Sequence, residues 1–428
     1  MATKPFGLFE VCGIEIEYMV VDRQTRNVRS LVESVLDQLV ADNHGGEALV
    51  FAGEGGVPVE WSNELVAHVA EAKCHRPISE PAALLEALRA GVARVNAILA
   101  AQGAQLMPSA AHPWMNPKKD ALLYPRDEEG IYKEYDRIFG CNTHGWTNLQ
   151  SVHINLPFAD AEEFGRLHAA IRVVLPLIPA LAAASPYLDG GFTGLLDARM
   201  EYYRTNSLRI PSMTGELIPE PVFTPEAYQT EILERIYRET KPLDPTGILH
   251  DEWANARGAI ARFDRNAIEI RVIDSQECPL ADLALAHAVI QITRMLAEER
   301  FVSLAELKSW DTRRLYNIFF AGVRDADQAL VDPQYAALFG FPPSAPESCG
   351  LASCAPTSRA RTFRELWGYL FALPELRHPL FSPVYQHYVV HGPLARRLLN
   401  RYGLTPTHAD LIAMVDALAT CLQDDVLF

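Results

Sequence analysis

Alternating apolar and polar residues predict three β-strands that each carry polar side chains on one face. Residues 10–22 place Glu15 and Glu17 between apolar neighbours, and residues 150–156 and 267–273 alternate in the same way. Side chains two residues apart on a strand point to the same face. We therefore expect each strand to pack one apolar face on a core and to present polar groups on the other.

Apolar residues at helical spacing predict helices between these strands. Ser79 is expected to cap one of them, with Pro81 in its first turn, and Asp160 with Glu163 forms a capping-box-like start for another. The predicted helices cover residues 30–42, 79–99, 160–184, 225–240 and 282–300, and the last one begins at Thr407.

The order of these elements favours an α+β domain built on an antiparallel sheet. Strands and helices do not alternate regularly, as they would in a doubly wound fold. The final third is mainly helical and is interrupted by residues 341–358, a segment rich in Pro, Ser and Cys that is typical of a loop or linker.

The composition is typical of a soluble globular enzyme, and the net charge argues against one class of partner, nucleic acids. The 428 residues are 49% apolar and 21% charged, and the net charge of −16 argues against nucleic-acid binding. We find no basic start followed by an apolar run, and no unbroken apolar run of about 18 residues, so neither a secretion signal nor a membrane span is expected. The seven cysteines include one close pair, Cys349 and Cys354, and suit a reducing cytoplasm, where we expect the protein to act.

The first candidate for chemistry is the pair Glu15 and Glu17. Uncompensated buried carboxylates cost several kcal/mol each, and a divalent cation offsets that cost through oxygen ligands. The alternative is a half-exposed strand whose polar face meets water.

A second acidic group lies in the segment NELVAHVAE, which contains Glu64, His68 and Glu71. On a helix the three would share a face. On a strand Glu64 and Glu71 would face oppositely unless a bend intervenes. A surface segment with solvated carboxylates is the plain alternative.

Two further groups lie on the other predicted strands. His153 and Asn155 share one strand face, and a neutral imidazole can bind a divalent metal or donate to phosphate. Glu269 and Arg271 share one face of another predicted strand. Glu269 can be a metal ligand beside an arginine that binds an anion, or the two can form a structural ion pair. A lone histidine on a strand is more often structural.

Three arginines, Arg199, Arg204 and Arg209, follow at a spacing of five, which suits a loop folding over a ligand or, alternatively, a plain charged surface. The P-loop pattern GxxxxGK[ST] and the pattern GxSxG are absent. Any ATP chemistry would therefore rely on metals and arginines.

Taken together and in this order, four motifs resemble the glutamate–cysteine ligase family, within the glutamine-synthetase-like carboxylate–amine ligases. The segment SPYLDG…TG…R at residues 185–199 resembles the second, bacterial and plant-like type. The four motifs are GIEIE at 13–17, NELVAHVAE at 63–71, QSVHIN at 150–155 and AIEIRVID at 267–274.

The resemblance implies a fold and a domain organisation. It implies a curved antiparallel sheet that forms a funnel with flanking helices, with Mg-ATP at one end and the amino acid at the other. Residues 1–300 would form this catalytic domain, and residues 301–428 a mainly helical region packed on it.

The resemblance also implies a site. Two or three Mg²⁺ ions would be held between ATP phosphates by six side chains, namely Glu15, Glu17, Glu64, Glu71, His153 and Glu269. Arg271 and Arg204 would be catalytic. Four further residues would bind substrate or ATP, namely Arg199, Arg209, Asn155 and Gln150.

The implied reaction is amide formation from glutamate or a similar acid and cysteine or another amine, through an acyl phosphate. Some relatives carry H-x-H where this chain has His153-Ile154-Asn155, and no short signature marks a cysteine-binding surface. A γ-glutamyl ligase for another amine, a guanidino-type phosphotransferase and a non-catalytic ATP- or amino-acid-binding protein stay open, as does a homo-oligomer.

Overall fold

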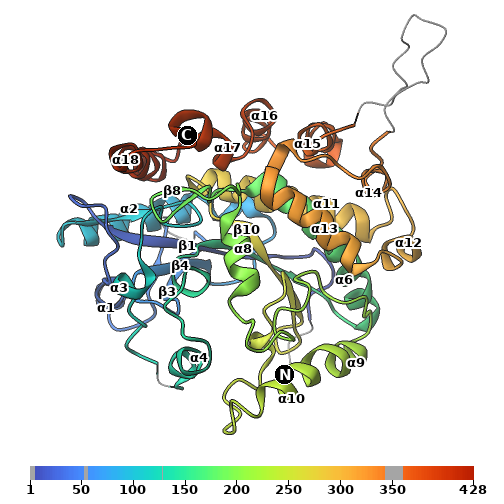
Figure 1. Ribbon diagram of the computed structural model, residues 1–428, viewed down its shortest axis with the longest axis horizontal. Helices are drawn as coiled ribbons and strands as arrows, with labels where there is room; N and C mark the ends of the chain where they lie inside the picture. Colours follow the sequence, from blue (N-terminus) through green and yellow to red (C-terminus); the bar gives the residue numbers. More distant parts are fainter. Residues whose placement is uncertain (1–4, 53–55, 128, 343–359) are drawn as a thin grey trace, which may run out of the picture.

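An antiparallel sheet of eight strands forms the centre of the molecule (Figure 1). The computed structural model describes residues 5–52, 56–127, 129–342 and 360–428. Strand β5 (Ala104–Met107) pairs with β1 beside the main path of the sheet. The main path runs β2 (Leu49–Val50), β3 (Val59–Asn63), β4 (Val69–Cys74), β1 (Gly13–Asp22), β6 (Ser151–Pro157), β10 (Ala267–Asp274) and β9 (Ala259–Arg262).

One face of the sheet is apolar and belongs to the main core. Ile14 and Ile16 of β1, Ile154 of β6 and Ile270 of β10 are fully buried in one hydrophobic cluster. The helices that cover this face are α2 (Leu85–Ala100), α6 (Ala161–Val174), α7 (Ile178–Ala182) and α11 (Pro279–Ala297). Burial of this face leaves the alternate side chains of the same strands pointing into the opposite side of the sheet.

Short helices border the other side of the sheet, and the C-terminal helices form a layer along one edge of the molecule (Figure 1). The short helices are α4 (Ile131–Phe139), α5 (His144–Thr147) and α8 (Ala198–Thr205). The C-terminal layer contains α15 (Phe363–Phe371), α16 (Ser382–His391), α17 (Leu394–Tyr402) and α18 (His408–Asp424). The remaining elements are α1 (Val32–Asp42), α3 (Pro117–Asp120), β7 (Tyr187–Leu188), β8 (Gly191–Phe192), α9 (Pro225–Tyr228), α10 (Glu234–Thr240), α12 (Leu304–Lys308), α13 (Thr312–Asp325) and α14 (Pro333–Ala337).

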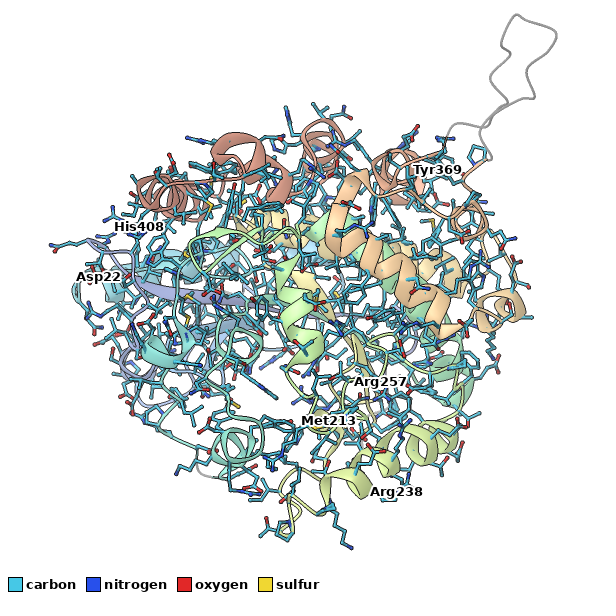
Figure 2. All side chains as sticks on the ribbon, in the orientation of Figure 1. Asp22, Met213, Arg238, Arg257, Tyr369 and His408 are labelled. Carbon is cyan, nitrogen blue, oxygen red and sulfur yellow. The ribbon has the colours of Figure 1, made fainter. Side chains whose placement is uncertain are left out.

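The chain between α8 and α9 has little regular structure and is anchored by one buried side chain. Arg257 donates to Glu220 through Nε and Nη2, each at 2.6 Å, and through Nη1 to the carbonyl oxygen of Ser212 at 3.0 Å. Figure 2 shows Arg257 beside Met213, whose carbonyl also accepts from it at 3.5 Å. This anchor holds the segment that follows α8, and α8 borders the site described below.

The predicted strands and most predicted helices are confirmed. Strand β1 begins at Gly13, and β6 and β10 match the predicted ranges to within one residue. Asp160 caps α6 by accepting from the backbone N–H groups of Glu162 and Glu163, and Thr407 begins α18 with a complete capping box. The predicted loop at 341–358, with Cys349 and Cys354, lies almost wholly outside the described residues.

Two local predictions are wrong. Ser79 does not cap a helix, because the chain first forms a 3₁₀ turn at Pro81–Leu84 and α2 begins only at Leu85. The segment from Ala198 to Thr205 is helix α8, capped by Asp197, and not a loop. The predicted helix 160–184 is interrupted at Leu175–Leu177, where Pro176 removes a backbone donor.

Two helical stretches, Ala161–Ala182 and Pro279–Ala297, are long and apolar enough to cross a membrane by length and composition alone. Within the fold, 94% and 83% of their apolar windows are buried. Helices at the centre of a folded domain have the same properties, so these two are explained by the core. The main hydrophobic cluster contains residues on both sides of residue 300, and the domain boundary there stays a prediction.

Candidate functional site

Strand register brings the polar side chains of separate motifs onto one face of the sheet. Glu15 lies opposite His153 of β6, and Glu17 lies opposite Glu71 of β4. Glu269 of β10 lies opposite Asn155. Directly opposed residues on antiparallel strands share a face and lie about 5 Å apart, so one surface gathers carboxylates from three strands.

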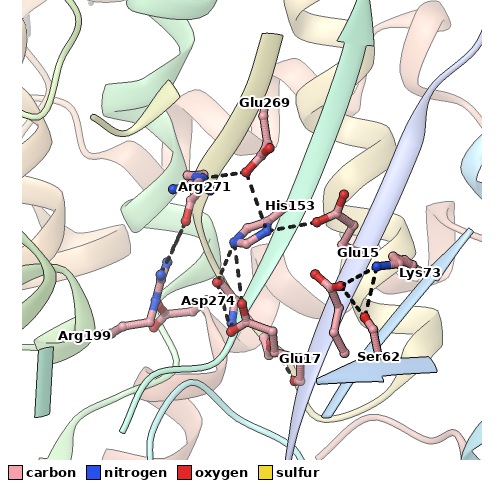
Figure 3. A network of polar contacts seen from close by, with 12 residues as sticks. Glu15, Glu17, Ser62, Lys73, His153, Arg199, Glu269, Arg271 and Asp274 are labelled. Carbon is pink, nitrogen blue, oxygen red and sulfur yellow. Dashed lines mark hydrogen bonds and ion pairs between the residues drawn. The ribbon is translucent and has the colours of Figure 1, made fainter. Parts of the chain in front are cut away.

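His153 is at the centre of this cluster (Figure 3). Its Nδ1 lies 3.3 Å from Glu15 Oε2 and 3.9 Å from Glu269 Oε1, and its Nε2 lies 3.7 Å from Glu17 Oε1. The ring is buried, which lowers its pKa, but the hydrogen bond with Glu15 and the charges of Glu17 and Glu269 outweigh this and raise the pKa to about 9. At neutral pH the imidazole is therefore a cation among carboxylates.

Glu15 and Glu17 are held by different partners. Glu15 accepts from Asn155 Nδ2 at 3.0 Å, and Glu17 accepts from the backbone N–H of Ser151 at 2.8 Å. Burial acts to raise the pKa of Glu15, but the hydrogen bond and charge of His153 outweigh it and hold the pKa well below its usual range. Glu15 therefore stays ionised while it has a cation beside it.

Glu71 lies at the β3–β4 side of the cluster. Its Oε2 accepts from Ser62 Oγ at 2.8 Å and from Lys73 Nζ at 3.2 Å (Figure 3). Burial, together with the negative charges of Glu15 and Glu64, raises the pKa of Glu71 well above its usual value. One lysine does not offset the repulsion from these carboxylates.

Glu64 follows β3 directly, and the bend between β3 and β4 places it in the same cavity as Glu17. The sequence had left helix and strand open for this segment, and the structure has two strands joined by this bend. Burial and then the charge of Glu17 raise the pKa of Glu64 to about 8. His68 of the same motif is not part of the cluster, because its Nε2 binds the carbonyl oxygen of Thr147 at 2.8 Å.

These carboxylates have the chemistry of a divalent-cation site. Ligand atoms of Glu15, Glu71 and His153 lie within 4.8 Å of one another. Mg²⁺ is bound through oxygen ligands, and an added positive charge would relieve the repulsion that raises the pKa of Glu71 and Glu64. The donor set therefore fits the implied metal, with the imidazole as a softer additional ligand.

On the β10 side the cluster ends at a basic group. Arg271 donates through Nε to Glu269, and Arg262 Nη1 lies 3.8 Å from the same carboxylate. Strand register shifts between Ile270 and Ile273, and Arg271 lies in this bulge, where its backbone N–H donates to the carbonyl oxygen of Gly258. A bulge re-aims the side chains that follow it, and here it leaves the guanidinium beside both the acidic cluster and open space.

A cavity of about 380 Å³ opens over this face. Glu17, Glu64, His153 and Arg271 line its polar side. Five aromatic residues also line it, namely Tyr132, Tyr135, Trp146, Tyr203 and Trp253. The volume is that of a small-ligand site, and the lining combines charged groups with aromatic rings.

Arg199 borders this cavity, but its charge is already paired with a carboxylate of the protein. It is 1% exposed and forms a buried ion pair with Asp274, and its Nη1 lies 3.3 Å from the carbonyl oxygen of Arg271 (Figure 3). Asp274 also accepts from the backbone N–H of Ala184 at 2.7 Å and from Ser185 Oγ at 3.0 Å. The pair therefore fixes the chain of the Arg271 bulge to the loop before α8.

Two of the arginines assigned to the site, Arg204 and Arg209, are not among the residues that line this cavity, and their roles stay a prediction. Arg204 pairs with Glu201 one turn earlier on α8, and the exposed Arg209 donates to the carbonyl oxygen of Ile138. Arg199 and Arg204 lie five residues apart on α8 and therefore point in different directions, whereas Arg209 lies beyond the end of that helix. Gln150, which comes directly before β6 and is fully buried, is not among the lining residues either.

Several residues at this site were missed from the sequence. Lys73 and Ser62 lie on the same faces of β4 and β3 as the acidic group, so strand alternation could have found them. Asp274 has the opposite parity to Glu269, and only the bulge brings it to the register of Ser151. The aromatic lining comes from α4, α5, α8 and the 3₁₀ turn at Glu252–Ala254, and carries no sequence signal that we recognise.

Comparisons with known proteins agree with this arrangement. The family model of glutamate-cysteine ligase family 2 (GCS2) matches residues 11–325. An uncharacterized protein of Archaeoglobus fulgidus is 36% identical over 287 residues, which cover 67% of this chain and 75% of that protein. A Rubrobacter xylanophilus protein named "Putative glutamate–cysteine ligase 2-3" is 26% identical over 293 residues, covering 67% and 69%.

Solved structures support the fold. The glutamate–cysteine ligase of Francisella tularensis, solved in complex with AMP, aligns with a TM-score of 0.57 over 96% of this chain and 89% of that one, at 10% identity. At this identity the likeness concerns the fold, which is of the glutamine-synthetase-like ligase type. The matched residues 11–325 contain every strand of the acidic cluster. The chain is an ATP-dependent carboxylate–amine ligase and belongs to glutamate–cysteine ligase family 2.

Proposed function

We propose that this protein joins the γ-carboxylate of glutamate to the amine of cysteine, with ATP hydrolysed to ADP and phosphate. The observation that carries the proposal is the cluster of five carboxylates and one imidazole on a single sheet face, with Arg271 at its edge. The five carboxylates are Glu15, Glu17, Glu64, Glu71 and Glu269. So many acidic groups in one buried cluster need cations, and ATP brings both phosphate charge and Mg²⁺.

The carboxylates and His153 would hold two or three Mg²⁺ ions against the ATP phosphates. Bound there, Mg²⁺ would neutralise the phosphate oxygens and orient the γ-phosphoryl group. Binding of the cations would require His153 to lose its proton, because only a neutral imidazole can be a ligand.

The residues of the chain would perform the rest of the reaction by positioning and by charge. The γ-carboxylate of glutamate would attack the γ-phosphorus of ATP, release ADP and form an acyl phosphate. Arg271 would stabilise the charge that spreads over the transferred group. The amine would then attack the acyl carbon and displace inorganic phosphate, leaving an amide.

The aromatic lining of the cavity would exclude water from the acyl phosphate. Tyr135 is half-buried, and Trp146 and Trp253 lie 5.1 Å and 5.9 Å from it between ring centres. Hydrolysis of the activated acid competes with amide formation, so a dry wall on the acceptor side favours the amine. These rings also supply apolar surface for the acceptor side chain.

The test is incubation of the protein with Mg-ATP and glutamate against a panel of amines that includes cysteine. Inorganic phosphate and the product mass are both scored. We expect phosphate release and a γ-glutamyl amide, with cysteine the best acceptor. A phosphorylated product without phosphate release would contradict the ligase reaction. Faster reaction of another amine would replace cysteine as the proposed acceptor.

Two variants test the acidic cluster. Glu15→Gln and Glu269→Gln should each lower turnover by about 100-fold or more, because each removes a charge that acts on the transferred phosphoryl group. The matched control is Glu298→Gln, whose side chain is 66% exposed just beyond the end of α11 and should leave turnover unchanged. Near-normal turnover in both cluster variants would refute the metal roles.

A further inference from the structure

A second cavity, of about 610 Å³, lies among the C-terminal helices. These helices, α15 to α18, form the layer along one edge of the molecule in Figure 1. Every residue that lines the cavity lies beyond residue 325, where the match to the family model ends. Its basic lining consists of Arg364, Arg396, Arg397, Arg401, His387 and His391.

Two buried carboxylates hold three of these arginines in place. Asp327 accepts from Arg364 Nε at 2.7 Å and from Arg396 Nε at 3.1 Å. Glu277 accepts from Arg397 Nη1 at 2.5 Å. Each carboxylate fixes a guanidinium at the cavity wall, so the basic groups are positioned before any ligand arrives.

Positive charge in this cavity exceeds negative charge. Arg401 is exposed at its edge and makes no ion pair within the described part of the chain. Its guanidinium carbon lies 5.0 Å from the ring centre of Phe428, the last residue of the sequence, whose carbonyl oxygen accepts from Arg397 at 3.3 Å. Four guanidinium groups thus face two carboxylates, Asp327 and Glu277, in a chain whose net charge is −16.

Buried donors in the cavity wall lack acceptors. Arg397 is 6% exposed, and its Nη2 has no hydrogen-bond partner among the described residues. His387 Nε2 is buried and likewise without a partner in the ranges that the structure describes, and its ring lies 4.7 Å from that of His391. An unsatisfied buried donor costs about 1–3 kcal/mol, so the wall lacks an acceptor that an anion would supply.

We propose that this cavity binds a small phosphate-bearing molecule. Guanidinium groups bind phosphate oxygens through paired charge-assisted hydrogen bonds, and the exposed Arg401 at the edge of the cavity offers such donors beside the buried Arg397. The volume is in the range of small-molecule sites. A nucleic acid does not fit, because the surface around the cavity belongs to a strongly acidic protein.

Arg401 is the residue to substitute. Arg397 is a poor choice, because its partner Glu277 follows a buried segment that reaches the catalytic cavity. In that segment Gln276 donates to the carbonyl oxygen of Asp274 at 2.6 Å, and Asp274 holds the edge of the cavity. Arg401 makes no ion pair in the described residues, so Arg401→Gln leaves no buried counter-ion unpaired. The matched control is Arg377→Gln, an exposed arginine in the same C-terminal region without an ion pair in the described residues.

The experiment is calorimetric titration of the full chain with pyrophosphate, in the presence of EDTA so that no cation bridges phosphate to the acidic cluster. We expect binding by the unsubstituted protein and by Arg377→Gln, and about tenfold weaker binding by Arg401→Gln. Glu17→Gln, in the other cavity, should bind pyrophosphate as the unsubstituted protein does. None of these titrations measures turnover, so this test of the C-terminal cavity does not depend on whether the protein is a glutamate–cysteine ligase.

Three results would overturn the proposal. The first is an absence of binding at millimolar pyrophosphate. The second is equal affinity in Arg401→Gln and the unsubstituted protein, which would place the anion elsewhere. The third is tighter binding of citrate than of pyrophosphate in a parallel titration, which would assign the cavity to carboxylates.

Discussion

Glu64 tests the electrostatics of the acidic cluster most directly. Its carboxyl group lines the cavity beside Glu17, and burial together with that neighbouring charge raises its pKa from 4.5 to about 8. Without cations, the folded protein therefore holds a proton on Glu64 over a pH range in which the unfolded chain has released it. Glu64→Gln removes this titration and keeps the shape of the side chain.

The sign and size of the effect follow from proton linkage. A raised pKa in the folded state stabilises the protein at low pH, and this contribution is lost as the pH rises through about 8. Between about pH 5.5 and about pH 9 the lost contribution amounts to about 3 kcal/mol. The stability of Glu64→Gln relative to the unsubstituted protein should therefore rise by about 3 kcal/mol over this range.

Urea unfolding in EDTA at several pH values measures this difference. Other groups titrate in both proteins, so comparing the two at each pH cancels their contributions to first order. Added Mg²⁺ should stabilise the unsubstituted protein above about pH 8 more than the variant, which has lost a negatively charged ligand. A stability difference that does not change with pH would refute the crowded-carboxylate explanation.

Three further predictions concern the surroundings of this cluster. Asp274→Asn should lower the free energy of unfolding by about 3–5 kcal/mol in urea, because it leaves Arg199 buried without its counter-ion; a loss below about 1 kcal/mol would contradict a buried pair. Arg204→Gln and Arg209→Gln should leave turnover within about twofold of normal in steady-state assays, since neither side chain lines the cavity, and a loss comparable to that of the cluster variants would support their predicted roles. Mg²⁺ binding at neutral pH should release protons, because the pKa of His153 is about 9 and a ligand must be deprotonated; calorimetry in buffers of different ionisation enthalpy measures this, and buffer-independent heats would argue against His153 as a ligand.

Much of the sheet could be predicted because its signals are local. The alternation around Glu15, His153 and Glu269 marks strands with one apolar and one polar face, and the structure has those strands. The helix starts at Asp160 and Thr407 were predictable for the same reason, since a cap involves residues only two or three apart. The prediction that Ser79 caps a helix failed because a 3₁₀ turn beginning at Pro81 precedes α2.

Other parts of the site depend on contacts between distant segments. The sequence left the shape of the Glu64–Glu71 segment open, and pairing of β4 with both β1 and β3 decided it. Arg199 looked like a ligand-binding arginine, whereas its burial against Asp274 follows from a bulge that has no sequence signature.

The amino-acid sequence by itself determined which residues are acidic, which strands carry them and which face of each strand is apolar, because these properties depend on residue type and on a two-residue repeat. Tertiary structure alone decided which carboxylates meet, which arginines reach them and which rings close the cavity. Those outcomes depend on strand register and on helix placement, which arise when segments far apart in the chain bury their apolar faces together.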